Sequence, residues 1–128
     1  MAQSNSFICD RAFEFASHAL KLCDRVYERG PSARHIASQL IRCGTSIGSN
    51  AEEAQEGQSK ADFIAKLSIS RKEARETSYW LRLAVKNEIV RPEEITWELN
   101  EARQLLAMIR SAILTARLSE SRGPDRST

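Results

Sequence analysis

The sequence predicts an all-α protein that folds as an antiparallel up-down-up-down four-helix bundle. Four long segments have apolar residues at alternating steps of four and three, which places those residues along one side of a helix. The 128 residues include only five Gly and three Pro, too few for the many turns of a β-sandwich or barrel. The length matches one domain, so a two-domain enzyme with a cleft between its halves is not expected.

The first two helices are separated by a Gly-Pro-Ser corner. Gly30 and Pro31 end the first helix because Pro cannot continue the backbone hydrogen-bond ladder. The hydroxyl of Ser32 is expected to cap the second helix, which extends to about Glu56. The apolar positions of the first helix are Ile8, Ala12, Phe15, Ala19, Leu22 and Val26. Those of the second helix are Ile36, Leu40, Cys43, Ile47, Ala51 and Ala54.

The third and fourth helices have recognisable starts. Ser59, with Asp62 three residues later, resembles a capping box and opens a helix that ends near Lys86. Its inward positions are Phe63, Leu67, Ser70, Ala74, Thr77, Leu81 and Ala84. The stretch 91–94 (Arg-Pro-Glu-Glu) opens the fourth helix, with Pro in the first turn and acids at the positive end of the dipole. Its inward positions are Ile95, Leu99, Ala102, Leu106, Ile109, Ile113 and Ala116.

The predicted domain spans residues 1–118, and residues 119–128 form a polar tail that we expect to be disordered. Three cysteines with no Cys-x-x-Cys pair indicate neither a disulfide framework nor a thiolate metal site. The chain lacks the Glu-x-x-His pairs of carboxylate-bridged metal bundles. It also begins without a basic-then-apolar targeting pattern and has no run long enough to cross a bilayer. We therefore expect a cytoplasmic protein with no metal and no other cofactor.

Basic charge gathers on the third helix. The whole chain has a formal net charge of +2, yet residues 59–86 alone hold seven basic and three acidic side chains. At about 100° per residue, five of the cations fall within an arc of about 80°. These five are Lys60, Arg71, Arg75, Arg82 and Lys86. Arg103, Arg110 and Arg117, seven residues apart, form a second line on the fourth helix.

These two basic stripes have two interpretations. They can neutralise the phosphates of RNA, and repetition in an oligomer would strengthen their field. Alternatively they pair with acids on neighbouring helices or subunits, such as Glu52, Glu56, Glu98 and Glu101. The sequence alone favours pairing, because charged helix faces are usually solvated or salt-bridged. No aromatic platform interleaves the stripes, so sequence-specific reading of a single strand is not expected.

Arg42, Ser46, Asn50 and Glu53 share one side of the second helix and are predicted to form a polar seam. This seam is either a pocket for a ligand or RNA, or a hydrogen-bonded network between helices. The network is favoured because buried polar groups must find partners in any case.

The stretch 44–48 matches the Gly-x-Ser-x-Gly pattern of hydrolase nucleophiles. No strand is predicted before it, so the sequence indicates no catalytic residue and we expect no enzymatic activity. The two glycines, which cost about 1 kcal/mol each in a helix, are better explained by close approach of a neighbouring backbone.

Ile69, Trp80 and Ala84 lie beside the core stripe of the third helix and are predicted to form an oligomer contact. A large exposed Trp beside Ile marks a contact surface more often than solvent, although a wide seam within the bundle is the competing explanation. With 6% aromatic residues and many core alanines, the bundle buries a thin core, so association with further copies is expected.

Two strings resemble a known family. Residues 42–54 (RCGTSIGSNAEEA) and 62–81 (DFIAKLSISRKEARETSYWL) resemble the bacterial four helix bundle proteins, among them S23 ribosomal protein-like proteins encoded in 23S rRNA intervening sequences. That family is also similar to the accessory variability protein of diversity-generating retroelements. The resemblance covers about residues 7–118, although the chain has Asn-Ala-Glu-Glu-Ala where Asn-Ile-Ala-Glu-Gly is commoner.

The resemblance implies a ring of five bundles without established catalytic activity, some of whose members are associated with RNA or a reverse transcriptase. The resulting hypothesis is a homopentamer that binds RNA or a nucleic-acid enzyme through its basic stripes. The alternative is a scaffold that recognises only protein partners, with its arginines in intersubunit salt bridges.

Overall fold

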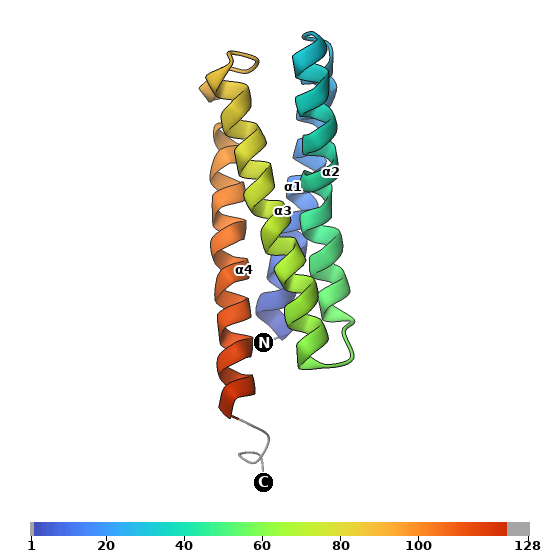
Figure 1. The fold of residues 1–128 in the computed structure, drawn as a ribbon, viewed down its shortest axis with the longest axis vertical. Coiled ribbons are helices and arrows are strands. Elements are labelled where there is room, and N and C mark those ends of the chain that lie inside the picture. The colour runs from blue at the N-terminus through green and yellow to red at the C-terminus, as the bar shows by residue number, and fades with distance from the viewer. Residues whose placement is uncertain (1, 123–128) are drawn as a thin grey trace.

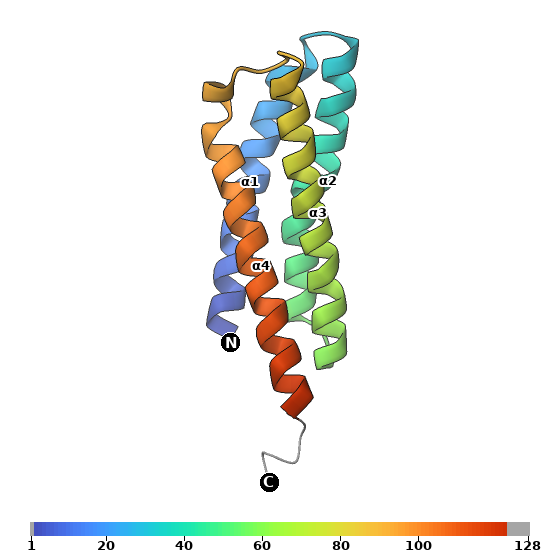
Figure 2. The same ribbon diagram turned by 60° about the vertical axis from the view of Figure 1, so that its left-hand side comes forward.

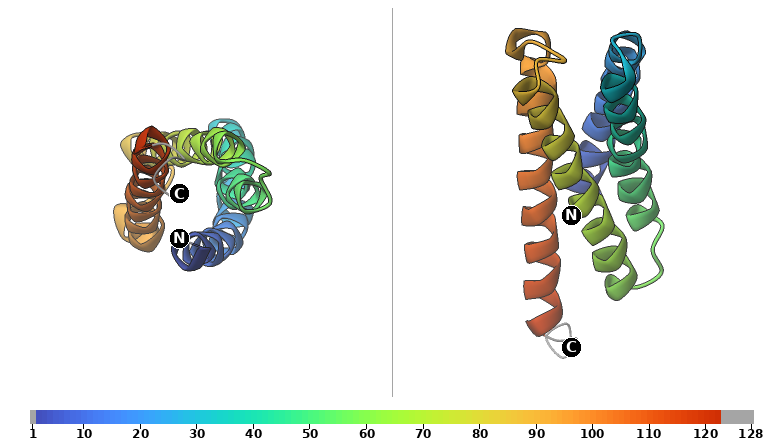
Figure 3. Two further views of the ribbon diagram at one scale, coloured as in Figure 1. Left: turned by 90° about the horizontal axis from the view of Figure 1, so that it is seen from below. Right: turned by 45° about the horizontal axis from the view of Figure 1, so that its top comes forward.

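The computed structural model describes residues 2–122, and the side chains of residues 6–119. It consists of helices α1 (Ala2–Tyr27), α2 (Pro31–Gln55), α3 (Lys60–Lys86) and α4 (Thr96–Arg122), with a short 3-10 helix at Pro92–Glu94 (Figure 1). Each helix packs against the next and α4 also contacts α1, so the four surround a common axis (Figure 3). The described residues include no strand. The predicted antiparallel four-helix bundle is confirmed.

The corner between α1 and α2 differs from its prediction in one respect. Gly30 is the N-cap residue of α2, and no side chain caps this helix. Ser32 lies inside the first turn, so the predicted hydroxyl cap is wrong. Gly30 adopts a φ of +131°, a region that residues with a Cβ rarely enter. Its carbonyl accepts the first hydrogen bond of α2, from the backbone N–H of Arg34 at 2.9 Å.

The other helix starts follow the sequence closely. Ser59 caps α3 as predicted, and its hydroxyl accepts a hydrogen bond from the N–H of Asp62 at 3.1 Å. The predicted start of the fourth helix forms the 3-10 turn, in which the Glu94 carboxylate accepts from the N–H of Arg91 at 2.9 Å. Helix α4 continues past Leu118 to Arg122. Residues 123–128 of the predicted tail lie outside the described part of the chain.

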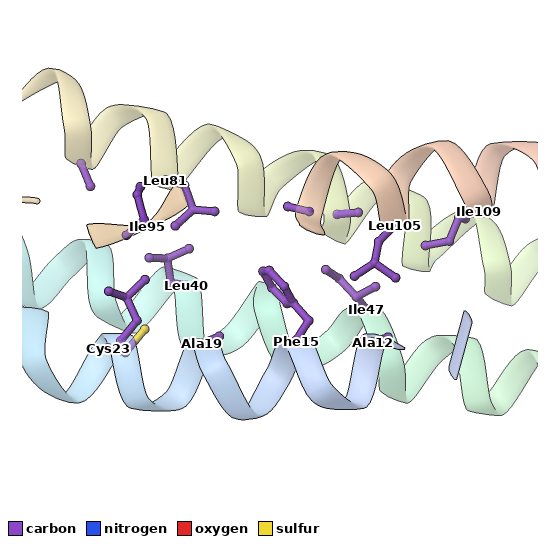
Figure 4. Packing of buried hydrophobic residues seen from close by; sticks show 14 of the residues in the cluster. Ala12, Phe15, Ala19, Cys23, Leu40, Ile47, Leu81, Ile95, Leu105 and Ile109 are labelled. Carbon is purple, nitrogen blue, oxygen red and sulfur yellow. The ribbon is translucent and has the colours of Figure 1, made fainter. Parts of the chain in front are cut away.

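The buried residues match the predicted inward positions on α1 and α2 throughout. On α3 only Phe63 is half-buried rather than buried, and on α4 the prediction needs a correction. Leu99 and Leu106 are half-buried, while Glu98 and Leu105 are buried. Figure 4 shows Leu105 pointing into the core. The inward side of α4 therefore includes positions 98 and 105 in place of 99 and 106, and the Glu98 carboxylate lies 3.9 Å from His18 on α1.

The two helical glycines of α2 face α1. A Cβ on Gly48 would lie 3.2 Å from the Cβ of Ala12, and one on Gly44 would lie 3.3 Å from the Cβ of Ala19. These positions therefore let the two helices pack closely, as predicted, and the Gly-x-Ser-x-Gly string lies in mid-helix. None of the helices in the described part of the chain is long and apolar enough to cross a membrane.

Candidate nucleic-acid interface

One flank of α3 packs against α2 through charged and aromatic side chains. Arg42 of α2 forms ion pairs with both Glu73, at 3.4 Å, and Glu76. Farther along, Glu53 of α2 lies 3.3 Å from the Nζ of Lys66. The indole Nε1 of Trp80 donates to Glu76 Oε2 at 3.1 Å. This flank of α3 is thus fixed to α2 and its charges are largely compensated.

The predicted polar seam forms part of this contact. Arg42 and Glu53 connect α2 to α3, as the favoured network interpretation expects. Ser46 and Asn50 instead bond within their own helix. The Ser46 hydroxyl donates to the Arg42 carbonyl at 2.6 Å, and the Asn50 Nδ2 donates to the Ser46 carbonyl at 2.9 Å. All four residues of the polar seam therefore have hydrogen-bond or ion-pair partners within the bundle.

The other flank of α3, which faces away from α2, has the predicted basic stripe. In this ring of four helices, the neighbour on that side is α4. Lys60 at the start of α3 donates to the Ser119 hydroxyl near the end of α4 at 3.0 Å. Figure 2 shows the two helices side by side along most of their length. The α3 stripe therefore borders α4.

The arginines of α4 are on the flank that faces α3. The opposite flank of α4 is fixed to α1, where Glu101 pairs with Arg11 at 2.7 Å and Trp97 stacks on His18 at 3.8 Å. At about 100° per residue the arginines lie on the far side of the core from these contacts. The two stripes therefore border one surface, here called the basic face. Its residues are Lys60, Arg71, Arg75, Arg82 and Lys86 of α3 and Arg103, Arg110 and Arg117 of α4.

The basic face is not neutralised within the chain. Seven of its eight side chains are exposed and Arg71 is half-buried. Among the described side chains, none of the eight is within ion-pairing distance of a carboxylate. Two of the acids that the pairing interpretation named are engaged elsewhere, Glu101 by Arg11 and Glu98 beside His18. Pairing within the bundle therefore does not account for these cations.

One residue that the sequence analysis missed lies against the basic face. The Arg82 guanidinium is 6.0 Å from the ring centroid of Tyr79, which is 49% exposed. One exposed aromatic ring therefore accompanies the stripe of α3. The signal was present, because residues three apart on a helix are neighbours.

The predicted oligomer contact separates into three environments. Ile69 is 40% exposed, and Trp80 is half-buried in the seam between α2 and α3. The prediction is wrong for Ala84, which is 1% exposed and belongs to the core of the bundle. A larger apolar surface lies on α1, where residues seven apart are 68%, 46% and 48% exposed. We call Phe13, Leu20 and Tyr27 the apolar stripe.

In the part of the chain that the structure describes, no three His, Cys, Asp or Glu side chains are close enough together to hold a metal ion. The fold and this surface define the class of protein as a small all-α bundle with a cationic face along its C-terminal hairpin.

Comparison with known proteins gives the family. The model of the 23S rRNA-intervening sequence protein family matches residues 5–111, and the chain belongs to this family. It is also similar to a crystal structure of a protein with unknown function from the S23 ribosomal protein family of Bacteroides thetaiotaomicron VPI-5482. The two are 34% identical with a TM-score of 0.79, over 86% of this chain and 97% of that one. No curated protein matches the chain. The resemblance noted in the sequence is confirmed.

Proposed function

We propose that this chain is a cytoplasmic, non-enzymatic accessory protein that associates with RNA through its basic face. One observation is the main support: eight cations from two helices border one surface, and no carboxylate of the described chain pairs with them. Such cations gain free energy by displacing the counterions condensed on phosphates. The family description refers to 23S rRNA intervening sequences, which agrees with a role near RNA or an RNA-handling enzyme such as a reverse transcriptase.

Self-association would multiply this surface. The homopentamer implied by the family resemblance would present five basic faces, and a repeated charge pattern raises the local potential. The apolar stripe of α1 supports association, since it places three large exposed apolar side chains along one line of the helix. It lies on a different hairpin from the basic face, so one surface can bind a second copy while the other binds RNA.

The salt dependence of RNA binding tests the proposal. Fluorescence anisotropy with a labelled single-stranded RNA should show affinity falling about 10²-fold from about 50 mM to about 200 mM salt if about five phosphates are neutralised. The variant Arg71→Glu with Arg75→Glu should bind at least about tenfold more weakly and have a shallower salt slope. The matched control is Lys21→Glu with Arg25→Glu on α1, which changes the net charge equally and should retain most of the affinity. Absence of salt-sensitive binding at low ionic strength would exclude the RNA role.

A second candidate function is a scaffold for protein partners alone, with the arginines in salt bridges between subunits. The observation that favours it is the exposed apolar stripe. Light scattering over a dilution series separates the two functions. If the scaffold is correct, Leu20→Glu and high salt both lower the mass of the assembly and RNA does not bind. If the primary proposal is correct, Leu20→Glu lowers the mass while the basic face of each bundle still binds RNA.

A further inference from the structure

A pocket opens near one end of the bundle, on the flank of α3 that packs against α2. Its volume is about 490 Å³, within the range of small-molecule sites. The first turns of α2, the last turns of α3 and the α3–α4 connection form its walls. The lining residues are Ser32, His35, Ile36, Trp80, Leu83, Asn87 and Ile89. The pocket thus combines an indole and aliphatic side chains with three polar groups.

The indole of Trp80 is held in place before any ligand arrives. Its Nε1 donates to Glu76, and that carboxylate is also paired with Arg42. The His35 ring meets the indole edge-on, with centroids 5.5 Å apart. Because the ring is already ordered, a ligand that packs against it loses little side-chain entropy.

Polar groups of the pocket are available to a ligand. The Asn87 Nδ2 donates to the Leu83 carbonyl at 3.0 Å, which leaves the amide oxygen as an acceptor. Within the described chain, the Ser32 hydroxyl and the nitrogens of His35 make no hydrogen bond. A flat heterocycle with donors and acceptors on its edge matches these groups better than an aliphatic ligand does.

A series of ring contacts connects the pocket to the basic face. Tyr79 meets Trp80 edge-on at 5.2 Å, and Arg82 lies 6.0 Å from the Tyr79 centroid. Lys86 of the basic face directly precedes Asn87 of the pocket in sequence. An RNA strand that occupies both sites therefore has to cross the outer side of α3, past Tyr79.

We propose that this pocket takes one unpaired base of single-stranded RNA, packed against Trp80, while the neighbouring phosphates contact Arg82 and Lys86. The inference rests on the proposed function and adds to it a preference for single-stranded RNA. Bases in a duplex are paired and stacked, so only an unpaired base can enter. Base–aromatic contacts tolerate any sequence, so the preference is for single strands over duplexes rather than for one base.

The fluorescence emission of Trp80 can report whether a base enters the pocket. The chain has two tryptophans, so Trp97→Phe leaves Trp80 as the only one. Titration of this variant with a short oligouridylate should quench the Trp80 emission, whereas a duplex of equal length should not. In the same background, His35→Ala with Asn87→Ala should weaken oligouridylate binding about tenfold and duplex binding far less. The control Ser38→Ala, exposed on the same helix and outside the pocket, should leave both affinities unchanged. Circular dichroism shows whether each variant remains folded.

Three outcomes would overturn the inference. If single strands and duplexes bind equally in a salt-dependent way with unchanged Trp80 emission, the pocket is not used and the basic-face proposal stands. If neither RNA binds, both proposals fail. If the Trp80 emission changes on dilution of the protein without RNA, a second copy covers the pocket and the base has no access to it.

Discussion

The N-terminal hairpin, α1 with α2, and the C-terminal hairpin, α3 with α4, are built differently. In the N-terminal hairpin, Gly44 and Gly48 let the helices approach closely, and large apolar side chains remain on its outer side. The C-terminal hairpin buries polar groups, Ser70 and Thr77 among them, and has the basic face outside. The proposed function assigns self-association to the first hairpin and RNA binding to the second.

Polar contacts join the two hairpins. The buried Ser70 hydroxyl of α3 donates to the Ile47 carbonyl of α2 at 2.6 Å. Arg11 of α1 makes paired hydrogen bonds to Glu101 of α4, at 2.7 and 2.8 Å. Because such bonds have strict geometry, they set the position of one hairpin relative to the other more precisely than apolar packing does.

The largest predicted effect concerns the close contact inside the N-terminal hairpin. Gly48→Leu should destabilise the protein by about 3 kcal/mol or more, because its side chain would meet Ala12, backbone atoms included. Urea denaturation followed by circular dichroism measures this. Ser49→Leu, on the exposed side of the same turn, is the matched control and should change stability by no more than about 0.5 kcal/mol. Equal effects of the two variants would show that the glycine is not required for packing.

The second prediction tests the polar link between the hairpins. Ser70→Ala removes a buried hydrogen bond and should lower the free energy of unfolding by about 1 kcal/mol. Ser68→Ala, on the same helix but half-buried and without a side-chain hydrogen bond in the described chain, should have a smaller effect. If Ser70→Ala instead raises the free energy of unfolding, the hydrogen bond positions α3 relative to α2 but does not stabilise the fold.

The sequence predicts the N-terminal hairpin better than the C-terminal one, and the reason is physical. The inward positions of α1 and α2 are strictly apolar or small, so periodicity alone finds them. On α4 the buried Glu98 breaks that rule, and its neighbour His18 belongs to another helix, which periodicity cannot detect. Helical spacing alone predicts which residues form the two basic stripes. The stripes lack carboxylate partners because Arg11 pairs with Glu101 and Arg42 pairs with Glu73. Only the folded arrangement shows these pairs.

The third prediction concerns pH and the start of α4. The Arg29 guanidinium and the Arg91 N–H lower the pKa of Glu94 from its ordinary 4.5 to about 2. The carboxylate form is favoured in the folded state, so this contribution is present above about pH 4.5 and is lost as pH falls toward 2. Arg29→Ala should therefore cost about 1 kcal/mol at pH 7, allowing for solvent screening of this surface pair. The difference between variant and parent should disappear near pH 2 in acid-denaturation curves.

The smallest predicted effect concerns the reactivity of the cysteine thiols rather than the stability of the fold. All three cysteines belong to the N-terminal hairpin, so thiol labelling reports on that hairpin alone. Burial raises the pKa of the Cys23 thiol to about 12 and also raises the pKa of Cys43. Both thiols should therefore resist a thiol-specific reagent at pH 8 until the hairpin opens, since the thiolate is the reactive form. Cys9→Ser removes the half-buried third thiol, so labelling then measures the opening of α1 from α2. Gly48→Leu in this background should accelerate labelling much more than Ser70→Ala does. Equal acceleration would show that the two hairpins open together, and that their different construction does not make them separate units of stability.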